Sequence, residues 1–484
     1  MKIAVIGAGF AGLSAAKVLR EFDHEVVVFE KAPDVGGVWS ATRRYPGLRT
    51  QNNKGTYAFS DLPMPRDYPE WPSGEQVQRY LESYVEKFGL APLLRLSTEV
   101  TRVARGEDGW AVTAAGATES FDHLIVANGI FSEPFIPPFE GAEALAAAGG
   151  RILAAGDFQD LADATGKHVI VVGYGKSACD VAVEIGRVAA STTVVARGLL
   201  WKMPRKIKGV LNYKYLLLTR MGEGLFRYIK PVGVEKFLHG RGDGVRRGML
   251  GSVAAVTTKQ LKLPGLGLVP GGAFEDIARS TVSLVTEGFF EAVADGRITV
   301  ARDTTITRFL EKDGAPHAEL ADGTVVRADL VVCATGFRQV VPFLDDEVMR
   351  KLTDERGNFQ LYRQILPHDV PNLTFAGYNS SFFSPLSAEM SALWIASHLA
   401  GLHSVPPVEE RRRLVAERLA WMEERTHGRH ARGTNIVPFS MHNIDEVLDE
   451  LGLNVGRATK ARQWLLPVAP GSYRDAIGVL KARR

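Results

Sequence analysis

Cysteine is scarce in this chain. Its 484 residues include only Cys179 and Cys333, which lie 154 positions apart. This spacing excludes a CxxC redox motif, and two cysteines are too few for a cysteine-rich metal site. The eleven histidines form no metal-ligand cluster, and no Ser/His/Asp arrangement stands out. We therefore expect no metal and a reducing, cytoplasmic location.

Long apolar runs are also lacking. No run approaches the roughly 18–20 residues that a membrane-spanning helix needs. The apolar N-terminus is interrupted by glycines and has no basic region before it, so we interpret it as mature structure rather than a signal peptide. The composition, 45% apolar and 23% charged, is typical of a globular protein. The length predicts two to three domains.

The charge is unevenly distributed. Residues 197–250 hold thirteen Lys or Arg and only three acids, so this segment carries about +10 although the whole chain carries +3. Such a basic segment can attract anionic cofactors, membrane headgroups or nucleic acid. We favour a solvated insertion with basic decoration. A weak contact with a membrane surface stays open, and no nucleic-acid partner is expected.

The first dozen residues, MKIAVIGAGFAG, carry the clearest motif. The apolar run from Ile3 to Ile6 ends in Gly7, Gly9 and Gly12, and a helix-like stretch follows. A buried strand, a glycine turn and a helix together form a phosphate site for a dinucleotide, because backbone N–H groups and the helix dipole face the pyrophosphate. Glu30 ends the next apolar run, where it is placed to bind a ribose hydroxyl. We predict an adenine dinucleotide here.

The following residues predict both loop and helix. Gly36 and Gly37 suggest a turn lying against the cofactor, with Trp39 as either a lid or a core residue. The stretch as far as Ser73 has no sustained period, and loops of this length are usually functional. Residues 74–89 have an i, i+3, i+4 apolar face and predict an amphipathic helix ending at Gly89. Short alternating runs at 98–116 predict a meander, and residues 122–129 a buried strand running into a glycine turn.

At residue 167 the opening pattern returns. A strand at 169–172 is followed by Gly173 and Gly175 and then a helix, with Ala178 at the third glycine position, which the fingerprint tolerates. The next strand ends in Arg197 rather than in an acid. An arginine there can pair with the 2′-phosphate that distinguishes NADP from NAD. The first site therefore suits FAD or NAD and the second suits NADPH, which together imply hydride transfer from NADPH to a bound flavin.

The rest of the chain predicts less regular structure. Residues 213–230 are compatible with an amphipathic helix interrupted at Gly222 and Gly224, and residues 273–293 predict a further helix. Residues 296–337 predict a meander whose final strand, DLVVCATG, repeats the form of the earlier DHLIVANG. Residues 409–425 predict a surface helix. The closing fifty residues predict irregular structure with short helices.

Five stretches together resemble a known family: GAGFAG, EKAPDVGGVW, YAFSDLPMP, GYGKSA and CATGF. They occur in this order in flavin-containing monooxygenases, the class B flavoprotein monooxygenases related to Baeyer–Villiger monooxygenases. The resemblance spans about residues 1–200 and 325–400. It implies an α/β fold with two Rossmann-like domains, one for FAD and one for NADPH, and an insertion of helices in the second. The implied boundaries are 1–160 and 326–484 for the two parts of the FAD domain, the latter with the C-terminal helices, and 161–325 for the NADPH domain, with the basic insertion around 200–270.

The resemblance also implies cofactor contacts. For FAD these are Gly7, Gly9, Phe10, Ala11, Gly12, Leu13, Glu30, Lys31, Val38 and Trp39. For NADPH they are Gly173, Gly175, Lys176, Ser177, Ala178, Asp180 and Arg197. Further cofactor contacts are expected at Thr50, Gln51, Asn52, Val100, Asn128, Thr335 and Gly336. The implied reaction is reduction of FAD by NADPH, addition of O2 at flavin C4a, and oxygenation of a small organic substrate by the hydroperoxide that retained NADP shields.

Two positions depart from the family pattern. In AGGRILAAGDF, the nearest match to the linker motif, Gly150 and Phe158 fit, but Ala148 and Ala154 replace the expected Phe and His. At the position where N-oxidising enzymes place a flavin-side Asn, this chain has Gln51, followed by Asn52. Either side chain is a candidate catalytic group that faces the isoalloxazine. The alternative is that both lie in a solvent-exposed loop. Lys54 matches a family lysine and equally suits a surface charge.

Oxygenation of an amine or sulfide is therefore the leading hypothesis. Baeyer–Villiger oxygenation of a ketone is the alternative within the family, because YPGLR resembles the YPGxR of that branch. An NADPH-driven flavin reductase is a second alternative, although the missing CxxC argues against a disulfide substrate. A flavin-binding sensor or membrane-surface adaptor is the non-enzyme alternative. The cofactor supplies the oxidant, so the protein needs position, dryness and hydrogen bonds rather than a catalytic triad.

Overall fold

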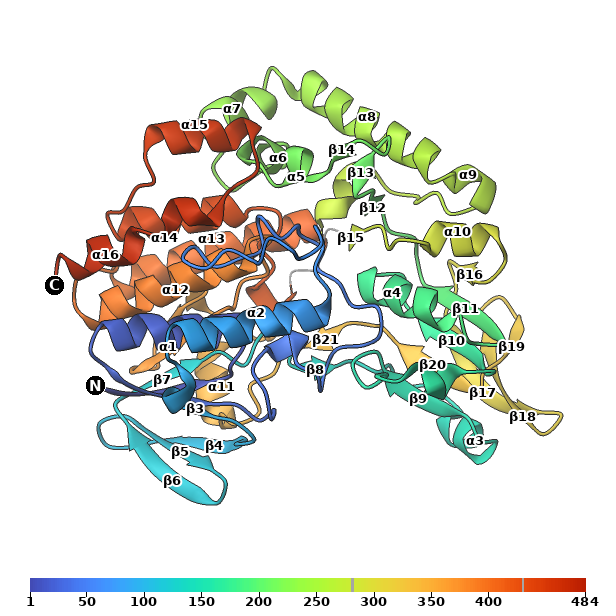
Figure 1. Ribbon diagram of the computed structural model, residues 1–484, viewed down its shortest axis with the longest axis horizontal. Coiled ribbons are helices and arrows are strands. Elements are labelled where there is room, and N and C mark those ends of the chain that lie inside the picture. Colours follow the sequence, from blue (N-terminus) through green and yellow to red (C-terminus); the bar gives the residue numbers. More distant parts are fainter. Residues whose placement is uncertain (280–282, 429–430) are drawn as a thin grey trace.

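The computed structural model describes residues 1–279, 283–428 and 431–484. Two five-stranded parallel sheets form its centre, as the α/β prediction requires. Figure 1 shows the first sheet with α1 and α2 on one side of the molecule and the second sheet with α4 on the other. Helices α5 to α9 run along the top between them.

The first sheet has the strand order β24-β7-β1-β2-β3. Its strands are β1 (Lys2–Ile6), β2 (Glu25–Phe29), β3 (Leu94–Arg95), β7 (His123–Val126) and β24 (Leu373–Phe375). Helix α1 (Phe10–Glu21) packs against α12 (Ser384–Leu399), so the N-terminal motif is buried under a helix from the other end of the chain. The predicted strand, turn, helix and strand are confirmed. Central parallel strands need cover on both faces, and here α1 and α12 cover one face.

The second sheet has the order β16-β11-β10-β20-β9. Its strands are β9 (Arg151–Ala154), β10 (His168–Val172), β11 (Ser191–Ala196), β16 (Thr299–Arg302) and β20 (Leu330–Cys333), and α4 (Lys176–Ile185) follows β10. The second sheet extends beyond the residues 161–325 expected for the NADPH domain, because its strand β9 lies before residue 161 and its strand β20 after residue 325. The boundaries of the domains as folding units stay a prediction.

Two antiparallel meanders flank the parallel sheets. The first consists of β4 (Val100–Arg105), β5 (Trp110–Ala114) and β6 (Ala117–Phe121), as predicted. The second consists of β17 (Ile306–Lys312), β18 (Ala315–Leu320) and β19 (Val325–Arg327). The meander predicted for 296–337 is therefore correct only in its middle, because β16 and β20 pair in parallel with the second sheet.

The long loop and the helix after it agree with the prediction. The loop contains only the short η1 (Gly37–Trp39). Helix α2 (Gly74–Lys87) begins with a capping box, in which Ser73 and Gln76 each accept a hydrogen bond from the other's backbone N–H. The turn that follows α2 needs glycine, because Gly89 has a φ of +58°.

The basic insertion is built from short elements. They are β12 (Lys202–Met203), β13 (Lys206–Ile207), β14 (Leu211–Asn212), α5 (Lys214–Leu217), α6 (Arg220–Gly224), α7 (Val234–Leu238), α8 (Asp243–Gln260) and α9 (Leu263–Leu266). We expected Gly222 and Gly224 to interrupt a helix, but both residues belong to α6. The break comes at Thr219, whose hydroxyl caps α6 by accepting from Gly222 N at 3.0 Å.

The helix predicted for 273–293 is wrong. Within the described residues this stretch forms η4 (Phe274–Ala278), β15 (Ser283–Leu284) and α10 (Phe289–Ala294), and residues 280–282 lie outside the description. Met203 O accepts from Val285 N, and β15 pairs in parallel with β12. Pairing with a distant strand thus replaces the local helix.

The C-terminal part is mostly helical. Its helices are α11 (Asp346–Leu352), α12, α13 (Val408–Thr426), α14 (Ser440–Glu450), α15 (Arg457–Leu465) and α16 (Ala476–Lys481). The surface helix at 409–425 and the short closing helices are confirmed. The remaining elements are α3 (Ala142–Ala147), β8 (Glu133–Pro134), β21 (Phe337–Arg338), β22 (Leu361–Tyr362), β23 (Leu366–Pro367) and the 3-10 turns η2 (Ala91–Leu93), η3 (Leu161–Ala164), η5 (Ala431–Gly433) and η6 (Pro470–Tyr473). In the described parts of the chain, no helix is long and apolar enough to cross a membrane.

A buried histidine fastens the insertion to this C-terminal part. His442, in the first turn of α14, lies 2.5 Å from a Glu223 oxygen through Nδ1 and 3.0 Å from a Glu235 oxygen through Nε2. Burial disfavours the charged ring, but the two carboxylates outweigh burial and raise the pKa of His442 to about 10. The insertion is thus held by an imidazolium between two glutamates.

We predict that His442→Gln lowers stability in a pH-dependent manner. The folded pKa of His442 lies above its unfolded value of about 6.5, so its contribution is fully present below pH 6.5 and is lost as the pH rises toward 10. Thermal unfolding at pH 6 should show a deficit of roughly 3–5 kcal/mol, the usual cost of removing one partner of a buried ion pair. The deficit should shrink by pH 10. A deficit independent of pH would contradict this, and the exposed His427→Gln is the control.

Candidate functional site

The first glycine turn is fixed by close backbone contacts. Gly7 has a φ of +114°, and a Cβ atom there would lie 2.4 Å from Ala127 O. A Cβ on Gly12 would lie 1.8 Å from Gly7 O. No side chain fits either position, so the turn and the start of α1 approach β7 only because both residues are glycine.

The N-terminus of α1 is open to an anion. Gly9 is the N-cap residue, no side chain caps the helix, and its first turn contains no acid. A Cβ on Gly9 would meet only the Gly37 backbone, at an ordinary 3.6 Å from Cα and 3.9 Å from N. Free backbone N–H groups and the helix dipole attract a phosphate at such a position. These residues therefore fit the pyrophosphate of a dinucleotide.

Glu30 lies directly beside this turn. Its carboxylate is 9% exposed and accepts hydrogen bonds from Ala8 N and Ala32 N, both at 2.8 Å. These bonds hold the acid at the carboxyl end of β2, next to the glycine turn, as the ribose prediction requires. Lys31 is exposed and Val38 is 37% exposed, whereas Trp39 is buried as a core residue in contact with Tyr57.

The other residues predicted to contact a cofactor lie after β7, in the long loop, in the first meander and after β20. Asn128 follows β7 near Gly7, where it donates to Val340 O and accepts from Tyr378 OH. The Thr50 hydroxyl is buried and has no hydrogen-bond partner among the described residues, so it is free to bond a ligand. Val100 begins β4 in the meander and is buried there. Thr335 and Gly336 follow β20, and the Thr335 hydroxyl donates to Phe135 O.

The second glycine turn repeats the first. Gly173 has a φ of +120°, and a Cβ there would lie 2.6 Å from Ala334 O. Gly175 is the N-cap of α4, again without a side-chain cap and without an acid in the first turn. Ala178 takes the third position with its methyl group buried. Arg197 directly follows β11, and its exposed side chain has no hydrogen bond or ion pair within the described ranges, so it is free to bind a phosphate.

Asp180 organises the start of α4. Its carboxylate is 2% exposed and accepts from the Lys176 ammonium, from Thr286 Oγ1 at 2.5 Å and from Tyr45 OH at 3.5 Å. Tyr45 also donates to Ser177 Oγ at 3.0 Å. Burial lowers the pKa of Lys176, and Asp180 opposes that shift. Tyr45 belongs to YPGLR, so this segment joins the loop of the first half to the second turn.

Gln51 and Asn52 lie where three segments meet. Gln51 Oε1 accepts from Leu284 N at 3.1 Å, and Gln51 O accepts from Tyr213 OH at 2.7 Å. The Asn52 amide is buried and donates to Phe382 O. The position is therefore not a solvent-exposed loop. The insertion and β15 cover it, as expected for residues that shape a substrate pocket between domains. Whether either amide faces a flavin stays a prediction.

Lys54 and YAFSDLPMP support this loop. The Lys54 ammonium donates to Arg66 O at 2.6 Å, to Pro65 O and to Tyr68 O. It therefore stabilises the conformation of the loop and is not simply a surface charge. Ser60 donates through N and Oγ to the fully buried Glu389 of α12, at 2.7 and 3.0 Å. Burial and then the nearby Asp61 raise the pKa of Glu389 to about 8.

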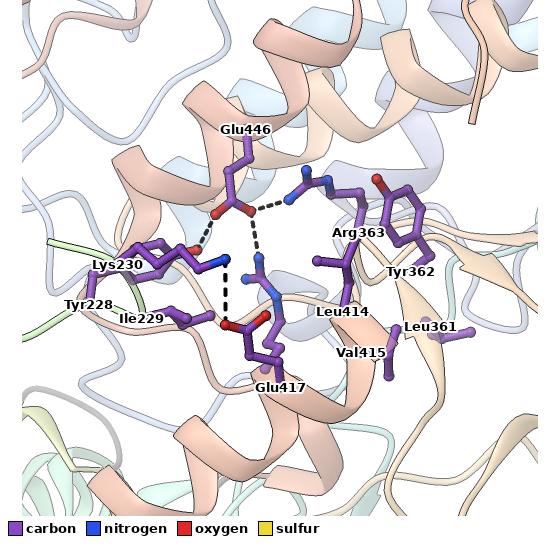
Figure 2. A pocket seen from close by; sticks show the side chains of 11 residues that line it. Tyr228, Ile229, Lys230, Leu361, Tyr362, Arg363, Leu414, Val415, Glu417 and Glu446 are labelled. Carbon is purple, nitrogen blue, oxygen red and sulfur yellow. Dashed lines mark hydrogen bonds and ion pairs between the residues drawn. The ribbon is translucent and has the colours of Figure 1, made fainter. Parts of the chain in front are cut away.

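A separate pocket of about 160 Å³ lies among α13, α14, β22 and residues 228–230 (Figure 2). Glu446 stands at its centre and accepts from Tyr228 OH at 2.6 Å, from Arg418 at 2.5 Å and from Arg363. Lys230 pairs with Glu417 at its edge. None of the predicted site residues lines this pocket, and its carboxylates are occupied by its own cations. We interpret it as a packing seam of the insertion.

Sequence reasoning missed several residues of the seam around Gln51. Tyr213 of the insertion and Leu284 of the stretch predicted as a helix contact Gln51, and Thr286 of the same stretch contacts Asp180. Gly377, with a φ of +74°, follows β24 and approaches α1 so closely that a Cβ would lie 2.7 Å from the Ala11 methyl. Its signal was a buried strand ending in glycine, the same as at Gly7 and Gly173.

Five of the thirteen basic residues of 197–250 pair with acids outside this segment. Arg205 pairs with Glu287, Lys214 with Glu70, Arg220 with Asp445, Lys230 with Glu417 and Arg246 with Glu275. Lys202 is buried and donates to Tyr174 O at 2.7 Å. Eight of the thirteen basic residues are exposed, as expected for a solvated basic decoration. Lys202, Arg220 and Arg246 differ, because they face inward and help to hold the insertion in place.

Known proteins agree with this architecture. A family model described as flavin-binding monooxygenase-like matches residues 1–242 and 284–463. The chain is 28% identical over 416 residues to 4-hydroxybenzoate brominase (decarboxylating) of Pseudoalteromonas luteoviolacea, covering 84% of this chain and 76% of that protein. It is 26% identical over 435 residues to flavin-containing monooxygenase 3 of Rattus norvegicus, with the same coverage.

A solved structure gives the same fold. Cyclohexanone monooxygenase bound to epsilon-caprolactone superposes with a TM-score of 0.70 at 21% identity, covering 93% of this chain and 97% of that one. The family agrees with the prediction of FAD and NADPH as cofactors, and the two open glycine turns fit two dinucleotides. The chain belongs to the flavin-binding monooxygenase-like family and is a flavin-dependent monooxygenase.

Proposed function

We propose that this enzyme uses NADPH and O2 to oxygenate a nitrogen or sulfur centre of a small organic substrate, with FAD at the first glycine turn and NADPH at the second. One observation carries the assignment of the cofactors. Both turns have the same backbone geometry, but the residue directly after β2 is Glu30 and the residue directly after β11 is Arg197. An acid accepts a ribose hydroxyl and repels a 2′-phosphate, whereas an arginine binds that phosphate.

The overall reaction balances as a monooxygenation. NADPH supplies two electrons as a hydride, and FAD, when bound, passes them to O2. One oxygen atom adds to the substrate lone pair, and the other leaves as water with a proton from solvent. For a sulfide, the products are the sulfoxide, water and NADP⁺. The Baeyer–Villiger alternative consumes the same NADPH and O2 but inserts the oxygen atom beside a ketone carbonyl.

The residues of the chain would hold the two cofactors in place and keep water away from the reacting atoms. Glu30 and the N-terminus of α1 would hold the flavin dinucleotide, and Arg197 and the N-terminus of α4 the NADPH. Tyr45 and Asp180 tie the loop of the first half to α4, which supports a fixed distance between the two cofactors. Tyr213 and Leu284 close over Gln51 and exclude water from the place where the substrate would meet the flavin.

The reaction class is tested by product analysis. Flavin-loaded enzyme with NADPH in air should convert a tertiary amine to its N-oxide or a sulfide to its sulfoxide, with one product formed per NADPH consumed. Gln51→Ala should lower this ratio and release the difference as H2O2, because the loop loses its bond to Leu284 N. Lactone from a ketone with neither other product would favour the Baeyer–Villiger alternative. NADPH oxidation without any oxygenated product would refute monooxygenation of these substrates.

The flavin site is tested by two neighbouring glycines. Gly9→Ala should fold normally, because its methyl group meets only an ordinary contact, but should lose flavin, because the methyl group fills the approach to the phosphate. Gly12→Ala should lose stability as well, because its Cβ would lie 1.8 Å from Gly7 O. The ratio of flavin to protein absorbance and the melting temperature of the apoprotein separate these effects. Full flavin occupancy in Gly9→Ala would mean that FAD does not bind at the N-terminus of α1.

The NADPH site is tested by Arg197→Ala. Removing a charge-assisted bond to the 2′-phosphate costs roughly 1.5–3 kcal/mol, so the KM for NADPH should rise about tenfold or more. The KM for NADH, which lacks this phosphate, should change less than twofold. Arg227→Ala, an exposed cation of the insertion, is the matched control. Equal changes for both nucleotides would mean that Arg197 does not bind the phosphate.

A further inference from the structure

Arg205 occupies an unusual position at the seam beside Gln51. It lies between β12 and β13, its side chain is 15% exposed, and its guanidinium stands over the Trp71 ring at 5.0 Å. The Nε atom is buried and has no hydrogen-bond partner among the described residues. Burying a cation is costly unless it is paired, so a buried guanidinium with a free donor calls for an anion.

The chain itself provides only a weak partner. Glu287 lies 3.4 Å from Arg205 Nη1, but its side chain is 88% exposed. An ion pair with such an exposed carboxylate contributes little, because water screens it. Burial lowers the pKa of Arg205; Glu287 and Asp180 oppose this shift, and the charge of Arg49 adds to it. A ligand carboxylate can therefore displace Glu287 at little cost and gain a bidentate bond.

A second arginine lies beside the same residue. Arg49 is exposed, and among the described residues its side chain donates one hydrogen bond, to the backbone oxygen of Trp71 at 3.4 Å. The positive charge of Arg49 acts on Arg205, and the two guanidinium groups repel each other until an anion joins them. Arginine binds a carboxylate through two parallel bonds and stacks on aromatic rings, so Arg205 and Trp71 together suit an acid that carries a planar ring.

Arg205 and the loop of Trp71 are connected by hydrogen bonds to the segment that contacts Gln51. Arg205 O accepts from Tyr213 N at 3.1 Å, and the hydroxyl of the same tyrosine donates to Gln51 O at 2.7 Å. The neighbouring Glu70 accepts from Asn212 Nδ2 at 2.6 Å and Lys214 Nζ at 3.1 Å, so the segment 205–214 and the loop of Trp71 form one rigid unit. Arg205 is thus connected to Gln51 through Tyr213.

We infer that Arg205, with Arg49 and Trp71, selects substrates that carry a carboxylate a few ångströms from the atom to be oxygenated. The substrate class is therefore a small organic acid with a soft nucleophile, such as an aromatic acid bearing a sulfide or amine. This inference rests on the proposed function for its reaction, but the binding of the acid does not depend on turnover.

A matched pair of sulfides tests the inference. The flavin-loaded enzyme is given methyl phenyl sulfide and 4-(methylsulfanyl)benzoate, which differ only in the carboxylate. The wild type should have a kcat/KM at least tenfold higher for the acid. Arg205→Gln should reduce this ratio by tenfold or more, Arg49→Gln should reduce it less, and Arg205→Lys should keep part of it. Arg227→Gln should keep the wild-type ratio.

Other outcomes would overturn the inference. An unchanged ratio in Arg205→Gln excludes a role in recognising the acid. A rise in the KM for NADPH with an unchanged ratio would instead assign Arg205 to a phosphate of the nucleotide. If neither sulfide is oxygenated, the proposed function fails, but titration calorimetry with 4-(methylsulfanyl)benzoate still decides. Binding to the wild type that is lost in Arg205→Gln supports the acid site, and no binding to the wild type refutes it.

Discussion

The architecture depends on one kind of contact, the approach of a glycine backbone to the carbonyl at the end of a neighbouring strand. At Gly7 and Gly173 a single Cβ atom would collide with Ala127 O and Ala334 O. Because both turns are so tight, α1 and α4 begin directly above the sheets with their N–H groups uncovered. Each sheet thereby ends in a place that attracts phosphate, and the chemistry of the enzyme is organised around the space between these two places.

The insertion contacts both the loop of the first half and the C-terminal part of the chain. Its segment 202–214 contacts the loop of Gln51 and Trp71, and its helices are fastened to the C-terminal part by Arg220–Asp445 and by His442 between Glu223 and Glu235. Most basic residues of 197–250 are exposed, whereas Lys214 and Arg220 take part in this attachment through their pairs with Glu70 and Asp445. Arg205 differs from them, because its own partner is exposed and one of its donors is unused.

Much of the fold could be predicted because the relevant signals are local. Buried strands, glycine turns and the acid or arginine after the next strand follow from residues that are neighbours in the sequence. The helix wrongly predicted for 273–293 shows the limit, since β15 forms by pairing with β12, about eighty residues earlier. Helix α12 gave no signal, because it is buried on nearly all sides and has no polar face to create a period. The partners of Gln51, which are Tyr213 and Leu284, likewise depend on tertiary contacts.

The central claim is that the two glycine turns hold different dinucleotides, FAD at α1 and NADPH at α4. A crystal structure of the enzyme with both cofactors bound tests this most directly. The account predicts the FAD pyrophosphate at the N-terminus of α1 with its ribose at Glu30, and the NADP 2′-phosphate at Arg197. The isoalloxazine should lie below the loop of Gln51. Density for the nicotinamide nucleotide at α1, or a 2′-phosphate remote from Arg197, would contradict the account.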